Sequence, residues 1–350
     1  MTSRRPMRDC WLAVNLSGLL PGAGQCYANQ WTKGLIVASV FLSLVAYSLW
    51  SLLAAQGSTI RALWAMAIAV IVYLLNLWDA FATAGRPVFP AGYKHRGRDI
   101  WYSVFLSQVL PGLGHLYLNR AIAGGIFLVA GVGLSMLANY RPVLLPMACT
   151  VWSIASYHAY RVAPRTPGKN FSCSGYMLMV VVLGSLLLRL CVGSLPLWVD
   201  NAVLQTFVPS ESMLPTLQAG DRLFVSRSQP YYPQTGDVVV FTPPRAALTT
   251  DTNADDLFVK RIVATPGQRV EVKQGQVWVN QQPLLETYMR EPMAYTWGPG
   301  IVPSDSYFVL GDNRNASADS HLWGFLPKDH IVGPAYKIYW PPSRVQSLER

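Results

Sequence analysis

Long apolar stretches separated by short polar ones fill the first 198 residues of the chain. Three of these stretches are long enough to cross about 30 Å of hydrocarbon as helices, namely 34–55, 62–84 and 176–198. Two shorter ones, 124–140 and 143–160, follow the same pattern. Together they predict a membrane α-helical bundle of about five spans.

Two further apolar runs, 11–20 and 100–110, are too short to cross a bilayer, and each ends at a Pro-Gly pair. Proline and glycine together stop a helix and start a turn. We therefore expect two interfacial or re-entrant half-helices in addition to the spans.

Beyond residue 199 the pattern changes to short alternating segments separated by turns, which is typical of a β-rich domain in water. The chain of 350 residues then divides into an N-terminal membrane bundle over 1–170, a final span over 171–199 and an all-β domain over 200–350. All five cysteines precede residue 198. The β-rich domain therefore has no disulfide framework and depends on its core.

The two halves of the predicted bundle share an internal repeat. Residues 20–27, Leu-Pro-Gly-Ala-Gly-Gln-Cys-Tyr, match residues 110–117, Leu-Pro-Gly-Leu-Gly-His-Leu-Tyr. The match continues in register at Asn29 and Asn119, at Gly34 and Gly124, and more loosely between 78–81 and 157–160. Each repeat is predicted to be a short helix, a turn and two spans. The turns either line a binding cleft or let helices pack closely, and close packing is the simpler interpretation.

Basic residues cluster in segments that flank the apolar runs. The formal net charge is +10 although only 13% of the residues are charged. The N-terminus and the segments 85–98 and 161–175 are rich in Lys and Arg, whereas 56–61 and 141–142 carry one Arg each. Such an asymmetry is a topology signal that puts the basic segments in the cytoplasm, and after five spans the β-rich domain lies outside. We therefore attribute the charge to topology rather than to nucleic-acid binding.

Ionisable residues inside the predicted spans are few, and they include Asp79, His158 and Arg189. An arginine within a span costs roughly 2.5–3.5 kcal/mol on insertion scales, so Arg189 is expected to snorkel toward the outer interface. A transport path would usually need more such groups.

The first candidate site is the segment 207–217, Phe-Val-Pro-Ser-Glu-Ser-Met-Leu-Pro-Thr-Leu. Two prolines hold the backbone out of regular structure, and in an extended chain Ser210 and Ser212 project to one side. A nucleophilic hydroxyl with a second hydroxyl beside it suits acyl transfer, because the neighbour can donate to the developing oxyanion. Taken alone, the segment is equally an ordinary loop.

The second candidate is Lys260 in the segment 257–263, Leu-Phe-Val-Lys-Arg-Ile-Val, which reads as a strand. Alternation places Lys260 on one face with Phe258 and Ile262. Burial between large apolar neighbours disfavours the charged form and lowers the pKa of a lysine. A neutral lysine can take a proton from serine, although an exposed lysine at a sheet edge is the alternative.

The third candidate is the polar segment 311–324, Gly-Asp-Asn-Arg-Asn-Ala-Ser-Ala-Asp-Ser-His-Leu-Trp-Gly. Its hydroxyl, amide and charged groups could orient a neutral lysine. A calcium loop is the alternative, but the acidic spacing does not match an EF-hand.

In order, spacing and wording, these three segments resemble the bacterial type I signal peptidases, Ser/Lys proteases that release exported proteins from the membrane. The resemblance covers roughly 200–340. It implies an all-β catalytic domain that binds its substrate as an added strand. It makes Ser212 the nucleophile and Lys260 the general base. It also makes Ser210 the oxyanion-hole hydroxyl, together with the backbone N–H of Ser212, and Ser317 the residue that orients the lysine.

The same resemblance implies a supporting shell and a substrate pocket. The supporting polar shell consists of Arg261, Asp312, Arg314 and Asp319, and the wall of a pocket for small side chains contains Val208 and Val259. No cofactor and no metal are expected, since the sequence has no motif for either. The implied partners are precursors that carry signal peptides and the lipid bilayer. The implied location is the bacterial cytoplasmic (inner) membrane, with the catalytic domain on its extracytoplasmic side.

The sequence departs from the family pattern at several positions. Ala264 and Gln268 stand where the family usually has Gly and Asp, Ala316 where Asn is common, and His321 where Arg is common. None of these is the nucleophile or the base, so the resemblance still implies an active enzyme. We expect the surroundings of Asp319 to be arranged differently. The repeat bundle also replaces the one or two spans that are usual in the family.

Three functions fit the sequence. The first is an endopeptidase that cuts exported precursors after a small-x-small stretch. The second is a processing enzyme dedicated to one class of substrate, such as a conjugation or pilus precursor. The third makes the bundle a transporter or binding module that carries the peptidase domain as a passenger, which the scarcity of ionisable residues in the spans disfavours.

Overall fold

The structure is a computed structural model that describes residues 8–85, 98–164, 174–227, 230–248 and 256–348. The basic segments 1–7, 86–97 and 165–173, on which much of the predicted topology depends, lie outside the described residues. The chain divides into two compact units. The first comprises Met1–Tyr47 and Trp64–Pro196, and the second comprises Ser48–Leu63 and Leu197–Arg350.

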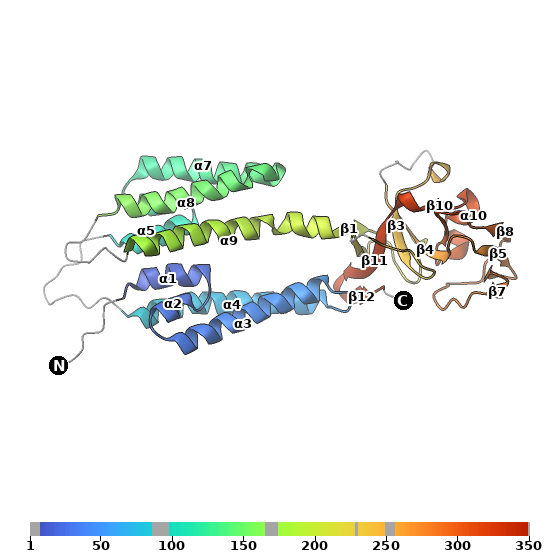
Figure 1. Ribbon diagram of the computed structural model, residues 1–350, viewed down its shortest axis with the longest axis horizontal. Coiled ribbons are helices and arrows are strands. Elements are labelled where there is room, and N and C mark those ends of the chain that lie inside the picture. Colours follow the sequence, from blue (N-terminus) through green and yellow to red (C-terminus); the bar gives the residue numbers. More distant parts are fainter. Residues whose placement is uncertain (1–7, 86–97, 165–173, 228–229, 249–255, 349–350) are drawn as a thin grey trace. The chain divides into compact units, whose positions relative to one another are not determined.

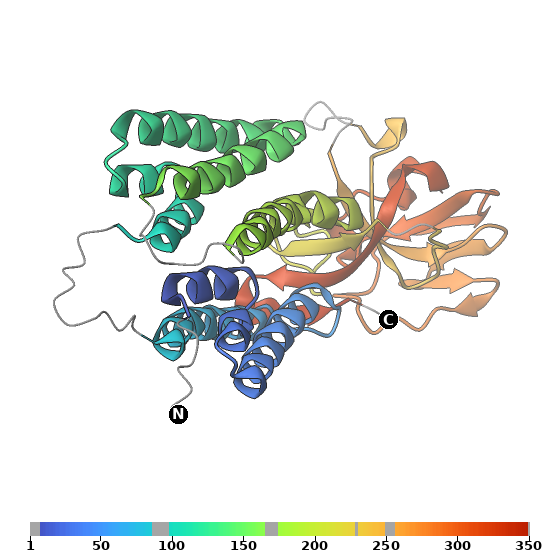
Figure 2. The same cartoon turned by 60° about the vertical axis from the view of Figure 1, so that its left-hand side comes forward.

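The first unit is helical (Figure 1). Its helices are α1 (Cys10–Leu19), α2 (Ala23–Tyr27), α3 (Trp31–Leu53), α4 (Thr59–Ala84), α5 (Ile100–Val109), α6 (Leu113–Tyr117), α7 (Ala121–Tyr140), α8 (Leu145–Val162) and α9 (Ser174–Ala202). Helices α7 and α8 lie side by side in two views (Figures 1 and 2). Apolar residues of α1, α5 and α9, among them Leu12, Val104 and Val181, form a buried cluster.

Four of the described helices are long and apolar enough to cross a membrane. They are α3, α4, α7 and α9, which correspond to four of the five predicted runs. The fifth run forms α8, an 18-residue helix that is not among these four. The fifth crossing therefore stays a prediction. Helix α9 continues to Ala202, so the β-rich part begins later than the predicted boundary at residue 200.

The two short apolar runs form α1 and α5, which end just before the Pro-Gly pairs as predicted. Each has an aspartate N-cap: the Asp9 carboxylate accepts from the backbone N–H of Trp11, and that of Asp99 accepts from Tyr102. Such caps satisfy N–H groups that a helix leaves without partners. The segments after the Pro-Gly pairs are not simple turns, because they form the short helices α2 and α6.

A glycine with a positive φ opens each of these short helices. Gly22 has φ 91° and Gly112 has φ 98°. A side chain at either position would also collide with backbone, because its Cβ would lie 2.0 Å from the Gly34 carbonyl oxygen or 2.1 Å from that of Gly124. The glycines shared by the two halves are thus required by close helix contact.

A polar pair lies at matching places in the two halves. Gln25 Nε2 donates to Asp79 Oδ2 at 2.9 Å, and Lys33 Nζ donates to Asp79 Oδ1. In the second half, His115 Nε2 and His158 Nδ1 lie 2.8 Å apart. Each pair joins a short helix to the last helix of its half.

The prediction that Arg189 snorkels outward was wrong. Its guanidinium donates to the Gln108 carbonyl oxygen and lies 4.0 Å from the ring centre of Trp152. A carbonyl and an aromatic face satisfy the cation inside the unit, so it does not need the interface.

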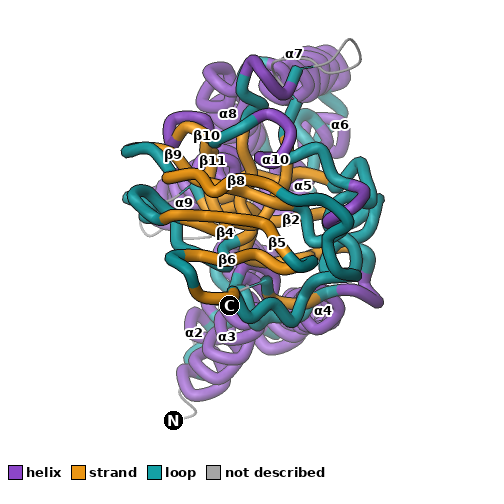
Figure 3. The backbone as a smooth tube through the Cα atoms, turned by 90° about the vertical axis from the view of Figure 1, so that its right-hand side faces the viewer, coloured by secondary structure: helices purple, strands orange, loops and turns teal. Residues whose placement is uncertain are grey.

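The second unit contains two antiparallel sheets. The strands are β1 (Val203–Phe207), β2 (Arg222–Ser226), β3 (Val238–Phe241), β4 (Phe258–Ala264), β5 (Arg269–Lys273), β6 (Gln276–Val279), β7 (Gln282–Pro283), β8 (Trp297–Ile301), β9 (Ser306–Leu310), β10 (Leu326–Pro327), β11 (Ile331–Trp340) and β12 (Gln346–Ser347). The larger sheet has the order β1-β2-β11-β3-β4-β9-β10, with β12 on β11. The smaller has the order β7-β6-β5-β8, and Figure 3 shows β8, β5 and β6 side by side.

Alternation along the strands divides the core of the larger sheet between its two faces. On β3, Val238 and Val240 belong to one buried cluster, whereas Val239 and Phe241 belong to another. Side chains of a strand point alternately to opposite faces, and both faces of β3 are covered. Between β9 and β10 lies one short helix, α10 (Ser320–Trp323).

The second unit also includes the end of α3, the start of α4 and the link between them. Lys337 on β11 is fully buried, and its Nζ donates to the carbonyl oxygens of Ser51, Leu52 and Ala54 at 3.0, 2.7 and 3.0 Å. These carbonyls lie at the C-terminus of α3, where a cation is favourable. The charged lysine thus fastens this helix end to β11.

Candidate active site

The candidate nucleophile lies in a loop between β1 and β2 that is closed by its own backbone. Val208 N–H donates to the Asp221 carbonyl oxygen, and Gly220 N–H donates to that of Val208, both at 2.8 Å. The Asp221 carboxylate accepts from Gln218 N–H and from the Arg344 guanidinium. The closed loop holds Ser212, which is only 8% exposed, over the sheet.

Lys260 reaches this serine from the middle of β4. Phe258 and Ile262, two residues before and after it, pack into one apolar cluster, as the alternation predicted. Lys260 is 5% exposed, and its Nζ lies 2.6 Å from Ser212 Oγ. Burial lowers the pKa of Lys260 to about 8, although Asp319 and then Asp312 oppose this shift. The amine can therefore be neutral near neutral to mildly alkaline pH and accept the hydroxyl proton.

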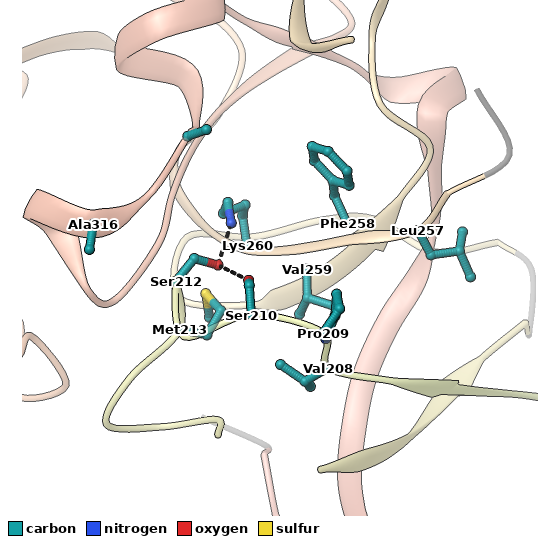
Figure 4. Close-up of a pocket in the computed structure, with 11 residues that line it drawn as sticks. Val208, Pro209, Ser210, Ser212, Met213, Leu257, Phe258, Val259, Lys260 and Ala316 are labelled. Atoms are coloured by element: carbon teal, nitrogen blue, oxygen red, sulfur yellow. Dashed lines mark hydrogen bonds between the residues drawn. The ribbon is translucent and has the colours of Figure 1, made fainter. Parts of the chain in front are cut away.

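Ser210 stands beside this pair. Its Oγ donates to Ser212 Oγ at 3.2 Å, and Figure 4 shows Ser210, Ser212 and Lys260 joined in one chain. Ser210 is exposed, in contrast to Ser212. The Ser210 hydroxyl is thus the solvent-facing end of this chain of three side chains.

A buried ion pair supports the site from β4 and the polar segment. Arg261 Nε and Nη2 donate to Oδ1 and Oδ2 of Asp312 at 2.8 and 2.7 Å. The Asp312 carboxylate also accepts from Thr216 Oγ1, and the Arg261 guanidinium lies 3.8 Å from the ring centre of Tyr288. A two-pronged contact of this kind fixes both partners in orientation as well as in distance. It ties the strand of Lys260 to the loop of Ser212.

A second buried pair fixes the start of the polar segment. Arg314 is fully buried, and its Nε donates to the Gly311 carbonyl oxygen at 2.9 Å, while its Nη1 donates to Glu286 at 3.0 Å. Burial raises the pKa of the neighbouring Tyr288, and the Glu286 carboxylate raises it further. Its hydroxyl donates to Glu286 Oε1 at 2.9 Å, which completes the partners of that carboxylate.

Asp319, the last member of the predicted polar shell, is also buried and has partners. Its Oδ2 accepts from the Gly311 N–H at 2.9 Å, and its Oδ1 lies 2.7 Å from His321 Nδ1. Gly311 itself has no room for a side chain, because a Cβ there would lie 2.3 Å from Ser317 Oγ and 2.4 Å from the Ser212 carbonyl oxygen. Asp319 therefore positions the backbone against which the nucleophile loop packs.

Ser317 is brought to the site, but the structure shows no hydrogen bond between it and Lys260. Its hydroxyl is buried and makes no hydrogen bond within the described residues. The contact distances at Gly311 place it close to the Ser212 backbone. Its role in orienting the lysine stays a prediction.

Val208 and Val259, predicted as pocket walls, both line a cavity of about 290 Å³ beside the serines. The lining also includes Pro209, Met213 and Leu257 (Figure 4). Among the described residues, no group of three or more His, Cys, Asp or Glu side chains could hold a metal ion.

Sequence reasoning missed Thr216, Glu286, Tyr288 and the part played by His321. Glu286 and Tyr288 lie between β7 and β8 of the smaller sheet. They contact Arg314 and Arg261, which are distant from them along the chain. The sequence shows only a carboxylate and an aromatic residue in a segment, 284–296, without strand periodicity. This pattern does not predict which residues the two side chains contact.

Comparison with known proteins identifies the family. Residues 181–340 match the family described as signal peptidase, peptidase S26. The chain is 45% identical over 144 residues to a signal peptidase I of Leptolyngbya laminosa, covering 41% of this chain and 71% of that one. The chain belongs to the signal peptidase I family. It is a signal peptidase of the serine protease type, and its apolar helices are consistent with a membrane-bound enzyme.

Other relatives of the peptidase have related names. It is 43% identical over 170 residues to the probable signal peptidase I-1 of Synechocystis sp., covering 48% of this chain and 82% of that one. It is 44% identical over 143 residues to the chloroplastic thylakoidal processing peptidase 1 of Arabidopsis thaliana, covering 39% and 42% of the two chains. A crystal structure of a signal peptidase I from Enterococcus faecalis V583 aligns with a TM-score of 0.24 at 27% identity, covering 30% of this chain and 97% of that one.

Proposed function

We propose that this signal peptidase removes signal peptides from exported precursors after small-x-small stretches, with Ser212 as nucleophile and Lys260 as general base. The observation that carries the proposal is the 2.6 Å contact between Lys260 Nζ and Ser212 Oγ, made by a lysine that is 5% exposed. A buried amine beside a hydroxyl has both the reach and the lowered pKa that a general base needs.

In the first step, neutral Lys260 takes the proton of Ser212 while Oγ attacks the scissile carbonyl carbon. The Ser210 hydroxyl and the backbone N–H of Ser212 donate hydrogen bonds to the resulting oxyanion. The carbon–nitrogen bond then breaks, and the lysine ammonium returns its proton to the leaving amine. A water molecule, deprotonated by the same amine, then attacks the acyl carbon. The carbon–Oγ bond breaks, and the lysine ammonium returns the proton to Ser212 Oγ.

Ser317 orients the amine in this mechanism. Its hydroxyl is buried without a hydrogen bond within the described residues, and an unpaired buried hydroxyl is costly. The ion pairs of Asp312 with Arg261 and of Arg314 with Glu286 hold the loops that carry these groups.

The preference for small side chains comes from the cavity beside the serines. Val208 and Val259 are 2% and 6% exposed and branch at Cβ, so they form stiff walls close to the nucleophile. A cavity of about 290 Å³ shared by more than one substrate position leaves little room for a large residue next to the scissile bond.

The location that we propose is the bacterial cytoplasmic membrane, with the catalytic domain outside. Helix α8 is decisive, because four crossings from a cytoplasmic N-terminus would leave that domain inside. At 18 residues α8 is about 27 Å long, close to the hydrocarbon thickness. Arg161 in its last turn lies on the side where basic residues are expected.

We also infer that the two halves of the helical unit are copies of one structural element. Support comes from the capped half-helices, the positive-φ glycines and the paired side chains Gln25 with Asp79 and His115 with His158. Sequence identity at these positions is partial, but an aspartate cap, a positive-φ glycine and a polar pair occur in both halves. A close-packed scaffold explains the glycines without a separate binding function.

The test is cleavage of two membrane-inserted precursors, one with Ala and one with Leu before the cut. The unmodified peptidase should release a mature product from the first and little from the second. Ser212→Ala should abolish cleavage, whereas Ser304→Ala, at an exposed turn, should not. More than a few per cent residual activity in Ser212→Ala would remove Ser212 as nucleophile, because dyad partners act as a unit. Equal cleavage of both precursors would refute the pocket assignment.

A further inference from the structure

The two carboxylates that act on Lys260 differ in the kind of cation that pairs with them. Asp312 and Asp319 are both fully buried, and both favour the charged form of Lys260. Asp312 is held by the Arg261 guanidinium, which keeps its charge at any pH the protein survives. Asp319 is held by His321, which is charged only when protonated. The charge near the lysine is therefore fixed on one side and variable on the other.

The geometry fixes how His321 meets Asp319. Its Nδ1 lies 2.7 Å from Asp319 Oδ1, and its side chain is 15% exposed while that of Asp319 is 0% exposed. An ionised carboxylate only accepts, so the neutral ring carries its proton on Nδ1. The other face of the ring is covered by Tyr295, whose ring centre lies 4.1 Å away at 16°. The Asp319 carboxylate and the Tyr295 ring thus both hold the imidazole, and Nε2 is the nitrogen that gains the second proton.

The remaining charged groups near this pair are accounted for. Arg314 and Glu286 neutralise each other at 0% exposure, and Arg261 neutralises Asp312. The Tyr295 hydroxyl stays neutral, since burial and then Asp319 raise its pKa. His321 is then the member of this cluster that carries a charge only when it is protonated.

We propose that His321 sets the pH below which the peptidase loses activity, by controlling through Asp319 how much negative charge Lys260 experiences. A neutral His321 leaves the Asp319 charge uncompensated, and this favours the ammonium form of Lys260. A cation at the same place cancels part of that charge and favours the neutral, reactive amine. The inference rests on the proposed role of Lys260 as general base, and it makes His321 a positioning residue that does not touch the substrate.

The test compares two variants of fixed charge. His321→Asn keeps an N–H donor near the position of Nδ1 but is neutral at every pH, whereas His321→Arg is cationic at every pH. For each variant of the full-length peptidase in detergent, kcat/KM on a soluble peptide is measured from about pH 5.5 to 10. This range includes the acidic limb, which is the pH region where kcat/KM rises as Lys260 loses its proton. The acidic limb of His321→Arg should lie about 1 pH unit below that of His321→Asn, the low end of the shift that a nearby charge produces.

A further variant tests the electrostatic role from the carboxylate side. Asp319→Asn should lower the acidic limb by itself, because it removes a negative charge that favours the ammonium form of Lys260. Altered packing against Tyr295 would lower the plateau value of kcat/KM in a variant. Such a loss does not change the pH of the acidic limb. Coincident limbs for His321→Arg and His321→Asn, or an unmoved limb in Asp319→Asn, would overturn the proposal. An unmodified peptidase without any acidic limb would instead refute Lys260 as the base.

Discussion

Lys260 shows how one residue depends on opposing effects. Desolvation favours its neutral form, and the carboxylates of Asp319 and Asp312 favour its charged form. Desolvation is the largest of these effects, so the pKa of Lys260 falls to about 8. The pKa of Lys260 therefore depends on its burial and on the buried carboxylates near it.

The most specific prediction for a single residue concerns Ser210. Ser210→Ala should raise the barrier by about 2.7–4 kcal/mol if its hydroxyl donates to the oxyanion, which is a loss of roughly 10²–10³ in kcat. KM should change little, because the ground-state carbonyl gains less from this donor. Steady-state kinetics on a soluble peptide will show the split. A change confined to KM would make Ser210 a substrate-positioning group instead.

The sequence points to the residues that we propose as catalytic, while it does not point to much of their support. Ser212 and Lys260 lie in segments whose local pattern is unusual, a hydroxyl pair between prolines and a lysine in an apolar strand. Glu286 and Tyr288 matter because of contacts with Arg314 and Arg261 that are distant along the chain. Such partners follow from the packing of two sheets, which periodicity does not specify.

At the scale of elements, the first unit contains two short helices, α1 and α5, that each end just before a Pro-Gly pair. The ends of α1 and α5 were predictable from Pro-Gly, but the helices α2 and α6 were not, since five residues carry too little periodicity. The partners of Arg189 were also hidden, because Gln108 and Trp152 lie on other helices.

Gly112→Ala should destabilise the helical unit, because the new Cβ would lie 2.1 Å from the Gly124 carbonyl oxygen at a positive φ. Strain of this kind costs on the order of 1–3 kcal/mol before any clash is counted. Gly133→Ala is the matched control, since its Cβ meets nothing within 4 Å in α7. Thermal unfolding in detergent should show a lower Tm for the first variant alone. Equal Tm values would mean that the turn is not tightly packed.

At the scale of the whole molecule, the catalytic unit is not a continuous stretch of chain. It includes Ser48–Leu63, which is fastened by Lys337 and by a hydrogen bond from Thr59 Oγ1 to the Tyr339 carbonyl oxygen at 3.0 Å. The sequence predicted a domain that starts after the last span. It held no local sign that a buried lysine on β11 would bind a helix end nearly 300 positions earlier, a separation of 286 residues from Ser51.

A truncated chain that begins at Gly175 should therefore keep its chemistry and lose stability. All proposed catalytic groups lie beyond residue 209, so kcat on a soluble peptide should stay close to that of the full chain. Its Tm should fall, because Lys337 loses three carbonyl partners whose removal costs about 1–3 kcal/mol. Lys337→Met in the full chain should reproduce the lower Tm, whereas Lys328→Met at an exposed position should not. A large loss of kcat on truncation would show that the removed part supports the active site directly.

The central claim is that a neutral Lys260 activates Ser212, and the pH dependence of kcat/KM on a soluble peptide tests it most directly. Because the pKa of Lys260 is lowered to about 8, the rate should rise about tenfold per pH unit below that value and level off above it. Lys260→Arg should be inactive throughout, since a guanidinium does not deprotonate in a protein. A profile that stays flat from about pH 6 to 9 while chemistry limits the rate would contradict the account.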